Sequence, residues 1–200
     1  MSLEKQLDKQ FWDTRWQQAE TGWDIGYAAP ALTDVIDQYP NREAAVLIPG
    51  CGNAYEAEYL VQQGYANITL IDIAPAAVKR LQQKFAKTPQ VKVICADFFT
   101  HEGHYDLILE QTFFCALSPA LREDYVNKMA SLLVPGGRLC GLLFSRNFEQ
   151  EGPPFGGTVS LYESLFSRRL DMVRLEPCTR SIPQRAGSEL FFEYIKARNV

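Results

Sequence analysis

From residue 44 onward, short runs of aliphatic and β-branched residues alternate with longer runs whose apolar residues recur every three or four positions. The short runs predict strands, and the longer amphipathic runs predict helices. Strands that alternate with helices indicate a parallel sheet with crossover helices. The expected strands are 44–49, 67–73, 91–98, 105–112 and 136–144, and the expected helices are 53–64, 75–87 and 119–133.

The end of the chain adds a helix at 162–170 and two strands at 172–177 and 188–198. The connection between these two strands, PCTRSIPQRAG, offers no helical crossover, so the last strand should be antiparallel. The sequence therefore predicts an α/β fold with a seven-stranded, mostly parallel sheet and helices on both faces.

The first 40 residues are polar and rich in tryptophan, with an expected helix over Lys5–Gln18 and a loop at 21–30. We expect this segment to act as an N-terminal cap or lid on a core of residues 41–200. A length of 200 residues with 46% hydrophobic content suits a single domain.

The composition indicates which partners and which cellular compartment to expect. A net charge of −4 provides no basic surface for nucleic acid. The five cysteines form no metal-binding spacing and indicate a reducing environment. The charged N-terminus resembles no signal peptide, and no apolar run could span a membrane. We expect a cytoplasmic monomer or weak dimer without a metal.

The expected first strand runs into Gly50-Cys51-Gly52, directly before a helix. Glycines at such a turn let a ligand approach the backbone, although they can also serve only to make a tight turn. Asp72 and Ile73 end the second strand about 20 residues later, where a carboxylate can accept hydrogen bonds from both hydroxyls of a ribose. Together the two features predict a nucleoside site.

Asp97 and Phe98 follow the third strand, at the same edge of the sheet. There the carboxylate could reach an adenine amino group and the ring could flank the adenine, but a turn-capping aspartate is the alternative. A dinucleotide site requires a third glycine where this chain has Tyr55. S-adenosyl-L-methionine carries no pyrophosphate and fits the loop better.

The glycine loop, the two carboxylates and the LLVPGGRL segment resemble the Rossmann-like class I methyltransferases. Within that class, the FWxxxW and GWD segments, EQTFFCA and GPPF are similar to the thiopurine S-methyltransferase family, in particular to its plant-type thiol and halide methyltransferase branch. The resemblance covers nearly the whole chain. It implies a methyltransferase that uses S-adenosyl-L-methionine and a small acceptor, either a sulfur nucleophile or a small anion.

The resemblance, together with the expected positions of residues around the site, suggests roles for individual residues. Gln111 stands where the related branch tends to have a tyrosine. The expected cofactor-binding residues are Trp12, Trp16, Trp23, Gly50, Gly52, Asp72, Ile73, Asp97, Phe98 and Gln111, and the expected acceptor-binding residues are Phe114, Arg146, Pro153 and Phe155.

Methyl transfer from a sulfonium is an in-line displacement that needs no obligatory base for a soft nucleophile. We therefore assign no catalytic residue, and we treat Cys115 as a buried apolar side chain. Arg146, Asn147 and Arg180 are the polar candidates for the acceptor site. One alternative is a non-catalytic adenosine-binding module. Another is a nicotinamide-dependent oxidoreductase, which Tyr55 and the lack of a substrate domain disfavour.

Overall fold

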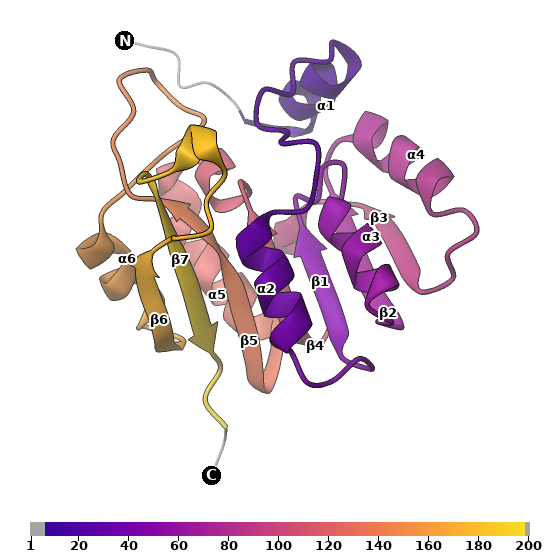
Figure 1. Ribbon diagram of the computed structural model, residues 1–200. Helices are drawn as coiled ribbons and strands as arrows, with labels where there is room; N and C mark the ends of the chain where they lie inside the picture. The colour runs from indigo at the N-terminus through magenta and orange to yellow at the C-terminus, as the bar shows by residue number, and fades with distance from the viewer. Residues whose placement is uncertain (1–6, 199–200) are drawn as a thin grey trace.

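The computed structural model describes residues 7–198, so the expected start of the first helix at Lys5 lies outside the described residues. A seven-stranded sheet forms its centre, in the order β3-β2-β1-β4-β5-β7-β6 (Figure 1). Strand β7 is antiparallel to both of its neighbours, and the other pairs are parallel, as predicted. The strands are β1 (Ala45–Pro49), β2 (Asn67–Asp72), β3 (Val91–Cys95), β4 (Tyr105–Gln111), β5 (Leu133–Phe144), β6 (Asp171–Pro177) and β7 (Glu189–Ile195).

Helices cover both faces of the sheet because successive strand residues point to opposite sides. Val46 and Ile48 of β1 pack with the helices on one face, and Leu47 packs with those on the other. The first face carries α2 (Pro30–Gln38), α3 (Tyr55–Gln62) and α4 (Pro75–Lys84), and the second carries α5 (Arg122–Leu132) and α6 (Val159–Phe166).

The N-terminal segment differs from the expected cap over residues 1–40. Helix α1 (Lys9–Gln17) begins after Asp8, whose Oδ1 accepts the amide of Phe11 at 2.9 Å. Helix α2 follows the expected loop, in a stretch for which the sequence predicted no element. It starts at Pro30, in the first helical position, and buries Leu32 and Ile36. Only the part before α2 therefore caps the strand ends, while α2 belongs to the layer that covers the sheet.

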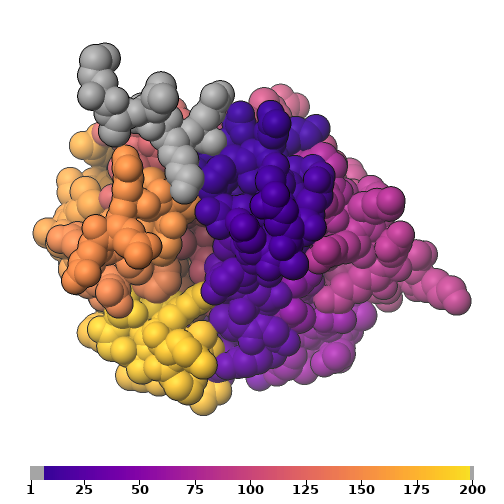
Figure 2. All heavy atoms as spheres, turned by 90° about the horizontal axis from the view of Figure 1, so that it is seen from above, coloured from indigo at the N-terminus to yellow at the C-terminus, as the bar shows by residue number. Residues whose placement is uncertain are grey.

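The strand order makes the connections from β1 and β4 diverge, which opens a crevice at the carboxyl ends of the strands. Figure 2 views the molecule from the side of these carboxyl ends. The N-terminal segment (indigo) crosses the middle of the molecule there, beside the loop after β5 (orange). In residues 7–198, no helix has the length and apolar character to span a membrane.

Candidate active site

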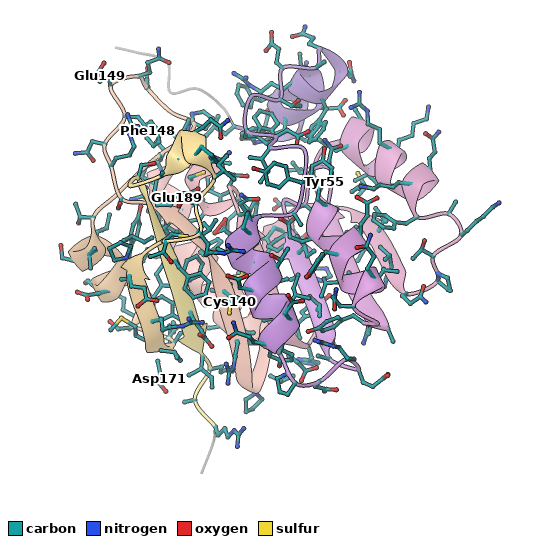
Figure 3. All side chains as sticks on the ribbon, viewed as in Figure 1. Tyr55, Cys140, Phe148, Glu149, Asp171 and Glu189 are labelled. Carbon is teal, nitrogen blue, oxygen red and sulfur yellow. The ribbon has the colours of Figure 1, made fainter. Side chains whose placement is uncertain are left out.

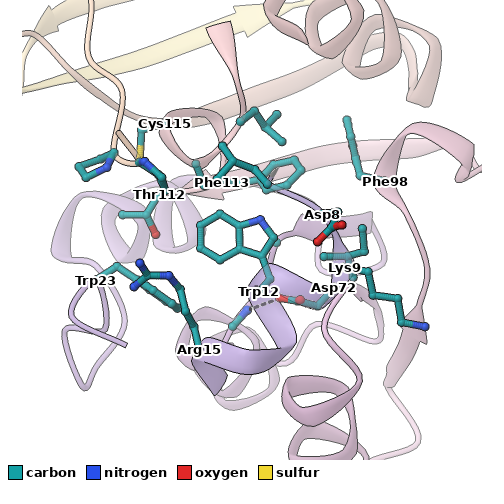
Figure 4. A pocket seen from close by; sticks show the side chains of 18 of the residues that line it. Asp8, Lys9, Trp12, Arg15, Trp23, Asp72, Phe98, Thr112, Phe113 and Cys115 are labelled. Atoms are coloured by element: carbon teal, nitrogen blue, oxygen red, sulfur yellow. Dashed lines mark hydrogen bonds between the residues drawn. The ribbon is translucent and has the colours of Figure 1, made fainter. Parts of the chain in front are cut away.

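A cavity of about 580 Å³ lies at the carboxyl ends of the strands, below the N-terminal segment (Figure 4). The strand order divides its wall in two. The β1–β3 half comprises the residues that follow those strands: Gly50, Gly52, Asp72, Ile73, Asp97 and Phe98. The β4–β7 half comprises Phe113, Cys115, Ala116, Leu117, Phe144, Pro153, Pro154 and Arg185.

The glycine loop needs glycine for conformation and for space. Gly50 and Gly52 have φ values of 56° and 53°, a region that other residues rarely adopt. A Cβ on Gly50 would lie 2.2 Å from Cδ2 of Phe113. The loop thus packs directly against the turn that follows β4, and its backbone faces the cavity.

Asp72 is held in place by the protein backbone. Its Oδ2 accepts the amide of Gly52 at 3.1 Å, and its Oδ1 accepts the amide of Ala74 at 2.9 Å. Burial raises the pKa of this carboxyl, and the amide hydrogen bonds oppose that rise. A carboxylate offers about four acceptor positions, so two remain for a ligand with adjacent hydroxyls.

Asp97 serves as a turn-capping residue and also lines the cavity, so both interpretations of this aspartate hold in part. The Oδ1 of Asp97 caps a short helix by accepting the amide of Phe99 at 2.9 Å, and the residue also lines the cavity. Phe98 is buried, and its ring meets that of Phe113 edge to face, with centroids 5.1 Å apart. Asp97 and Phe98 thus form the part of the β1–β3 half that follows β3.

The three N-terminal tryptophans line the cavity together. The ring of Trp23 lies edge to face with those of Trp12 and Trp16, at centroid distances of 5.6 and 5.9 Å. Oδ1 of Asp13 accepts the amide of Ala76 at 2.6 Å, which attaches α1 to the first turn of α4. These contacts make the N-terminal segment the roof of the cavity.

After β4 the structure differs from the expected assignments. Phe114 is buried in the core with 1% exposure, and Phe113 takes the place at the cavity wall. Gln111 does not line the main cavity. It lines an adjoining space of about 50 Å³, with Thr112 between the two.

The loop after β5 contributes Pro153, as expected, together with Pro154. Phe155 does not line the cavity, since its ring lies against Gly152 and its amide donates to the carbonyl of Cys115 at 2.7 Å. Arg146 is exposed, with its guanidinium 4.9 Å from the ring centroid of Phe148. On the same loop (Figure 3), Glu149 is exposed, whereas the half-buried ring of Phe148 packs edge to face against Phe144, with centroids 5.1 Å apart.

The other polar candidates also lie away from the cavity. Asn147 is exposed, and Arg180 forms an ion pair with Asp34 at 3.0 Å. Neither residue lines the cavity.

Arg185, which the sequence reading did not single out, lies in the cavity wall. Its Nη2 donates to the carbonyl of Trp23 at 2.8 Å, and its Nη1 lies 3.5 Å from Oε1 of the buried Glu189. The guanidinium also lies 5.7 Å from the ring centroid of Phe144. The topology could have indicated this residue, because the connection from β6 to β7 returns at the carboxyl ends of the parallel strands.

No side chain of the β4–β7 half is suited to act as a base. Burial raises the pKa of the Cys115 thiol, and the neighbouring Glu110 raises it further, so the thiol stays protonated. Neither histidine of the chain lines the cavity. In the described part of the chain, no group of three or more acidic, histidine or cysteine residues could hold a metal ion. The site is built for binding and orientation.

This architecture occurs in solved methyltransferases. The 1,6-didemethyltoxoflavin N1-methyltransferase of Burkholderia thailandensis, solved with S-adenosylhomocysteine, superposes with a TM-score of 0.73 at 19% identity. The match covers 94% of this chain and 87% of that one. The fold is that of the class I S-adenosylmethionine-dependent methyltransferases.

The family follows from the sequence comparisons. The thiopurine S-methyltransferase profile matches residues 7–193, and the chain belongs to this family. A probable thiol methyltransferase 2 of Arabidopsis thaliana is 33% identical over 77% of this chain and 70% of its own length. Thiocyanate methyltransferase 1 of Brassica oleracea is 28% identical over 94% and 85%.

Membership identifies the chain as a small-molecule methyltransferase with S-adenosylmethionine as its cofactor. The cavity fits this group. The carboxylate of Asp72 lines the cavity, the backbone at Gly50 and Gly52 carries no side chains, and the three tryptophans form an aromatic roof. The nicotinamide-dependent alternative is wrong.

Proposed function

We propose that the protein methylates a small sulfur nucleophile, such as a thiol or thiopurine, or a small anion such as thiocyanate or halide. The observation that carries this proposal is one continuous cavity with a carboxylate at one half and a guanidinium at the other. The names of the relatives, which include thiol, thiocyanate and thiopurine methyltransferases, support the same acceptor chemistry.

The β1–β3 half is the proposed place of the cofactor. Asp72 would accept the ribose hydroxyls, Asp97 and Phe98 would contact the adenine, and the glycine loop would pass under the amino-acid part. The roof tryptophans would face the sulfonium, since aromatic faces attract cations. When bound, the cofactor supplies an electrophilic methyl group.

The β4–β7 half is the proposed place of the acceptor. Arg185 would favour an anionic nucleophile and orient it, because a guanidinium stabilises a thiolate or a small anion over the neutral form. Phe144, Pro153 and Pro154 remove water from the nucleophile, which raises its reactivity. Proximity and desolvation then carry the reaction without a protein base.

The proposed setting is the cytoplasm, where the five free cysteines would stay reduced. The proposed assembly is a monomer or weak dimer, which light scattering over a range of concentrations tests. A mass of 22.7 kDa at micromolar concentration is the expected result.

The test is a screen of the purified protein with S-adenosylmethionine against aliphatic and aromatic thiols, thiopurines, iodide and thiocyanate. Formation of S-adenosylhomocysteine and of the methylated product is measured by mass spectrometry. We expect turnover with at least one acceptor. Binding of S-adenosylhomocysteine without transfer to any acceptor would instead indicate the non-catalytic adenosine-binding module.

A further inference from the structure

Behind the cavity wall, at the end of β4, lies the carboxyl group of Glu110, which is completely buried. Glu110 does not line the cavity, and it forms no ion pair with any residue in 7–198. Burying a carboxyl without a cation is unfavourable unless hydrogen bonds compensate. The contacts of Glu110 therefore indicate what the group does.

Oε1 of Glu110 accepts the amides of Phe113 and Phe114 at 2.9 and 3.2 Å. These amides open a short 3₁₀ helix (Phe114–Ala116). Thr112, directly before them, has a φ of 60°, which is unfavourable for a β-branched residue. The carboxylate thus stabilises a turn, residues 112–116, whose own backbone does not favour this shape.

The 112–116 turn touches both halves of the cavity. Phe113 packs against the backbone of Gly50, where any side chain would collide with its ring. The carbonyl of Cys115 accepts the amide of Phe155, which fixes the loop that carries Pro153 and Pro154. A shift of the turn would therefore move the glycine loop and the acceptor wall together.

We propose that Glu110 is a positioning residue whose ionised carboxylate holds the 112–116 turn in the shape that joins the two halves of the cavity. The inference rests on the proposed function in so far as it concerns the same cavity. It adds a residue that touches neither ligand and yet controls the affinity for both.

The surroundings of Glu110 make this control dependent on pH. Burial raises its pKa to about 7, and the coulombic effect of Glu189 from β7 adds to the rise, whereas the two amides lower it. Tyr125 from α5, Tyr162 from α6 and Cys115 also face the carboxyl. The two amides favour the ionised carboxylate, so Glu110 would have a still higher pKa in a loosened turn that keeps it buried. Loosening of the turn without exposure of Glu110 is therefore favoured as the pH falls through neutrality.

The experiment measures calorimetric affinity for S-adenosylhomocysteine at pH 6 and pH 8 in wild type, Glu110→Gln and Glu110→Ala. Wild type should bind about tenfold more weakly at pH 6 than at pH 8. Glu110→Gln, which is nearly isosteric and does not titrate, should show a clearly smaller ratio. Glu110→Ala should bind weakly at both values.

Amide hydrogen exchange of residues 110–116 in the unliganded protein gives a readout that does not need a ligand. Exchange should be faster in wild type at pH 6 than at pH 8 after correction for intrinsic rates, and Glu110→Gln should remove this dependence. Glu56→Gln is the matched control, because Glu56 is also buried, has a raised pKa and accepts one amide, that of Ala29. It should keep the wild-type ratios.

The inference is overturned if Glu110→Gln retains the wild-type pH dependence of both affinity and exchange. A wild-type protein that binds no S-adenosylhomocysteine at pH 8 would contradict the proposed function instead. In that case the exchange data alone would still decide on the role of Glu110.

Discussion

At the scale of single residues, Asp72 illustrates a binding group that is positioned before its ligand arrives. The amides of Gly52 and Ala74 fix both carboxylate oxygens, so the side chain needs no reorientation on binding. Such preorganisation lowers the entropic cost of association. Because both contacts are amide donors to a carboxylate, removing the negative charge of Asp72 should weaken them.

We predict that Asp72→Asn weakens binding of S-adenosylhomocysteine by about 1.5–3 kcal/mol, because a carboxylate accepts hydroxyl hydrogen bonds more strongly than a neutral amide. Calorimetry measures the change. The control is Asp106→Asn, since Asp106 also accepts a backbone amide, that of Ala45, at the opposite edge of the sheet. Equal affinities of wild type and Asp72→Asn would show that the ribose lies elsewhere.

Arg185 is the corresponding residue on the acceptor side. We predict that Arg185→Gln lowers kcat/KM for thiocyanate or a thiolate by about tenfold or more, since a charge-assisted contact of about 1.5–3 kcal/mol is lost. The affinity for S-adenosylhomocysteine should change much less. Steady-state kinetics and calorimetry separate the two effects.

Arg180→Gln serves as the control for Arg185. Arg180 forms only an exposed ion pair with Asp34, a kind of contact that contributes little. A loss of activity that is equal in both variants would argue against a specific contact between Arg185 and the acceptor.

At the scale of elements, α1 forms a roof that rests on α4, where the buried Trp16 packs with Ala74 and Ala77. Oδ1 of Asp13 accepts the amide of Ala76, and Nη2 of Arg80 donates to the carbonyl of Trp16 at 3.4 Å. The loop after β5 is different, because the amides of Phe155 and Gly157 and the carbonyl of Gly156 all form hydrogen bonds. We therefore expect a closing movement of the N-terminal segment that carries α1, and none of the loop after β5.

We predict that S-adenosylhomocysteine protects the chain before Ala31 from proteolysis and changes tryptophan fluorescence. Asp13→Ala should weaken both effects, because the anchor of α1 on α4 is lost. Glu20→Gln is the control, since its ion pair with Arg15 is long, at 3.8 Å, and exposed. Identical cleavage of wild type with and without ligand would rule out the closing roof.

The strands and most helices could be predicted from the sequence because burial imposes a regular period on them. The details after β4 could not be predicted. The rule that side chains alternate between two faces assumes an extended strand. Thr112 instead adopts a left-handed conformation, and Phe113 rather than Phe114 lines the cavity. Helix α2 was missed because Pro30 and its neighbours also suit a loop.

The position of Asp72 beside the glycine loop could be predicted, since strand order alone places both at one edge. The topology places the connection that carries Arg185 at the carboxyl ends of the strands, but no local pattern shows which of its side chains enters the cavity. Arg146 and Phe155 lie in a segment close to the cavity in sequence. Their side chains nevertheless point to Phe148 and Gly152.

At the scale of the whole molecule, the buried carboxyl of Glu110 affects stability as well as binding. Its pKa is raised from 4.5 to about 7 in the folded protein, so folding favours the neutral form. The stabilisation is fully present below pH 4.5 and is lost as the pH rises through about 7. A shift of this size corresponds to a free energy on the order of 3 kcal/mol.

We predict that the difference in unfolding free energy between wild type and Glu110→Gln changes in favour of the variant as the pH rises from 5 to 8. Urea denaturation at several pH values measures this difference and removes contributions from other groups. Two stability curves that run parallel over the whole range would contradict the prediction.

The roof reaches both halves of the cavity. A Cβ on Gly52 would lie 3.4 Å from the Trp16 ring, and the carbonyl of Trp23 receives a hydrogen bond from Arg185. Because this one segment contacts both halves, a movement of the roof that admits one ligand would also change the surroundings of the other.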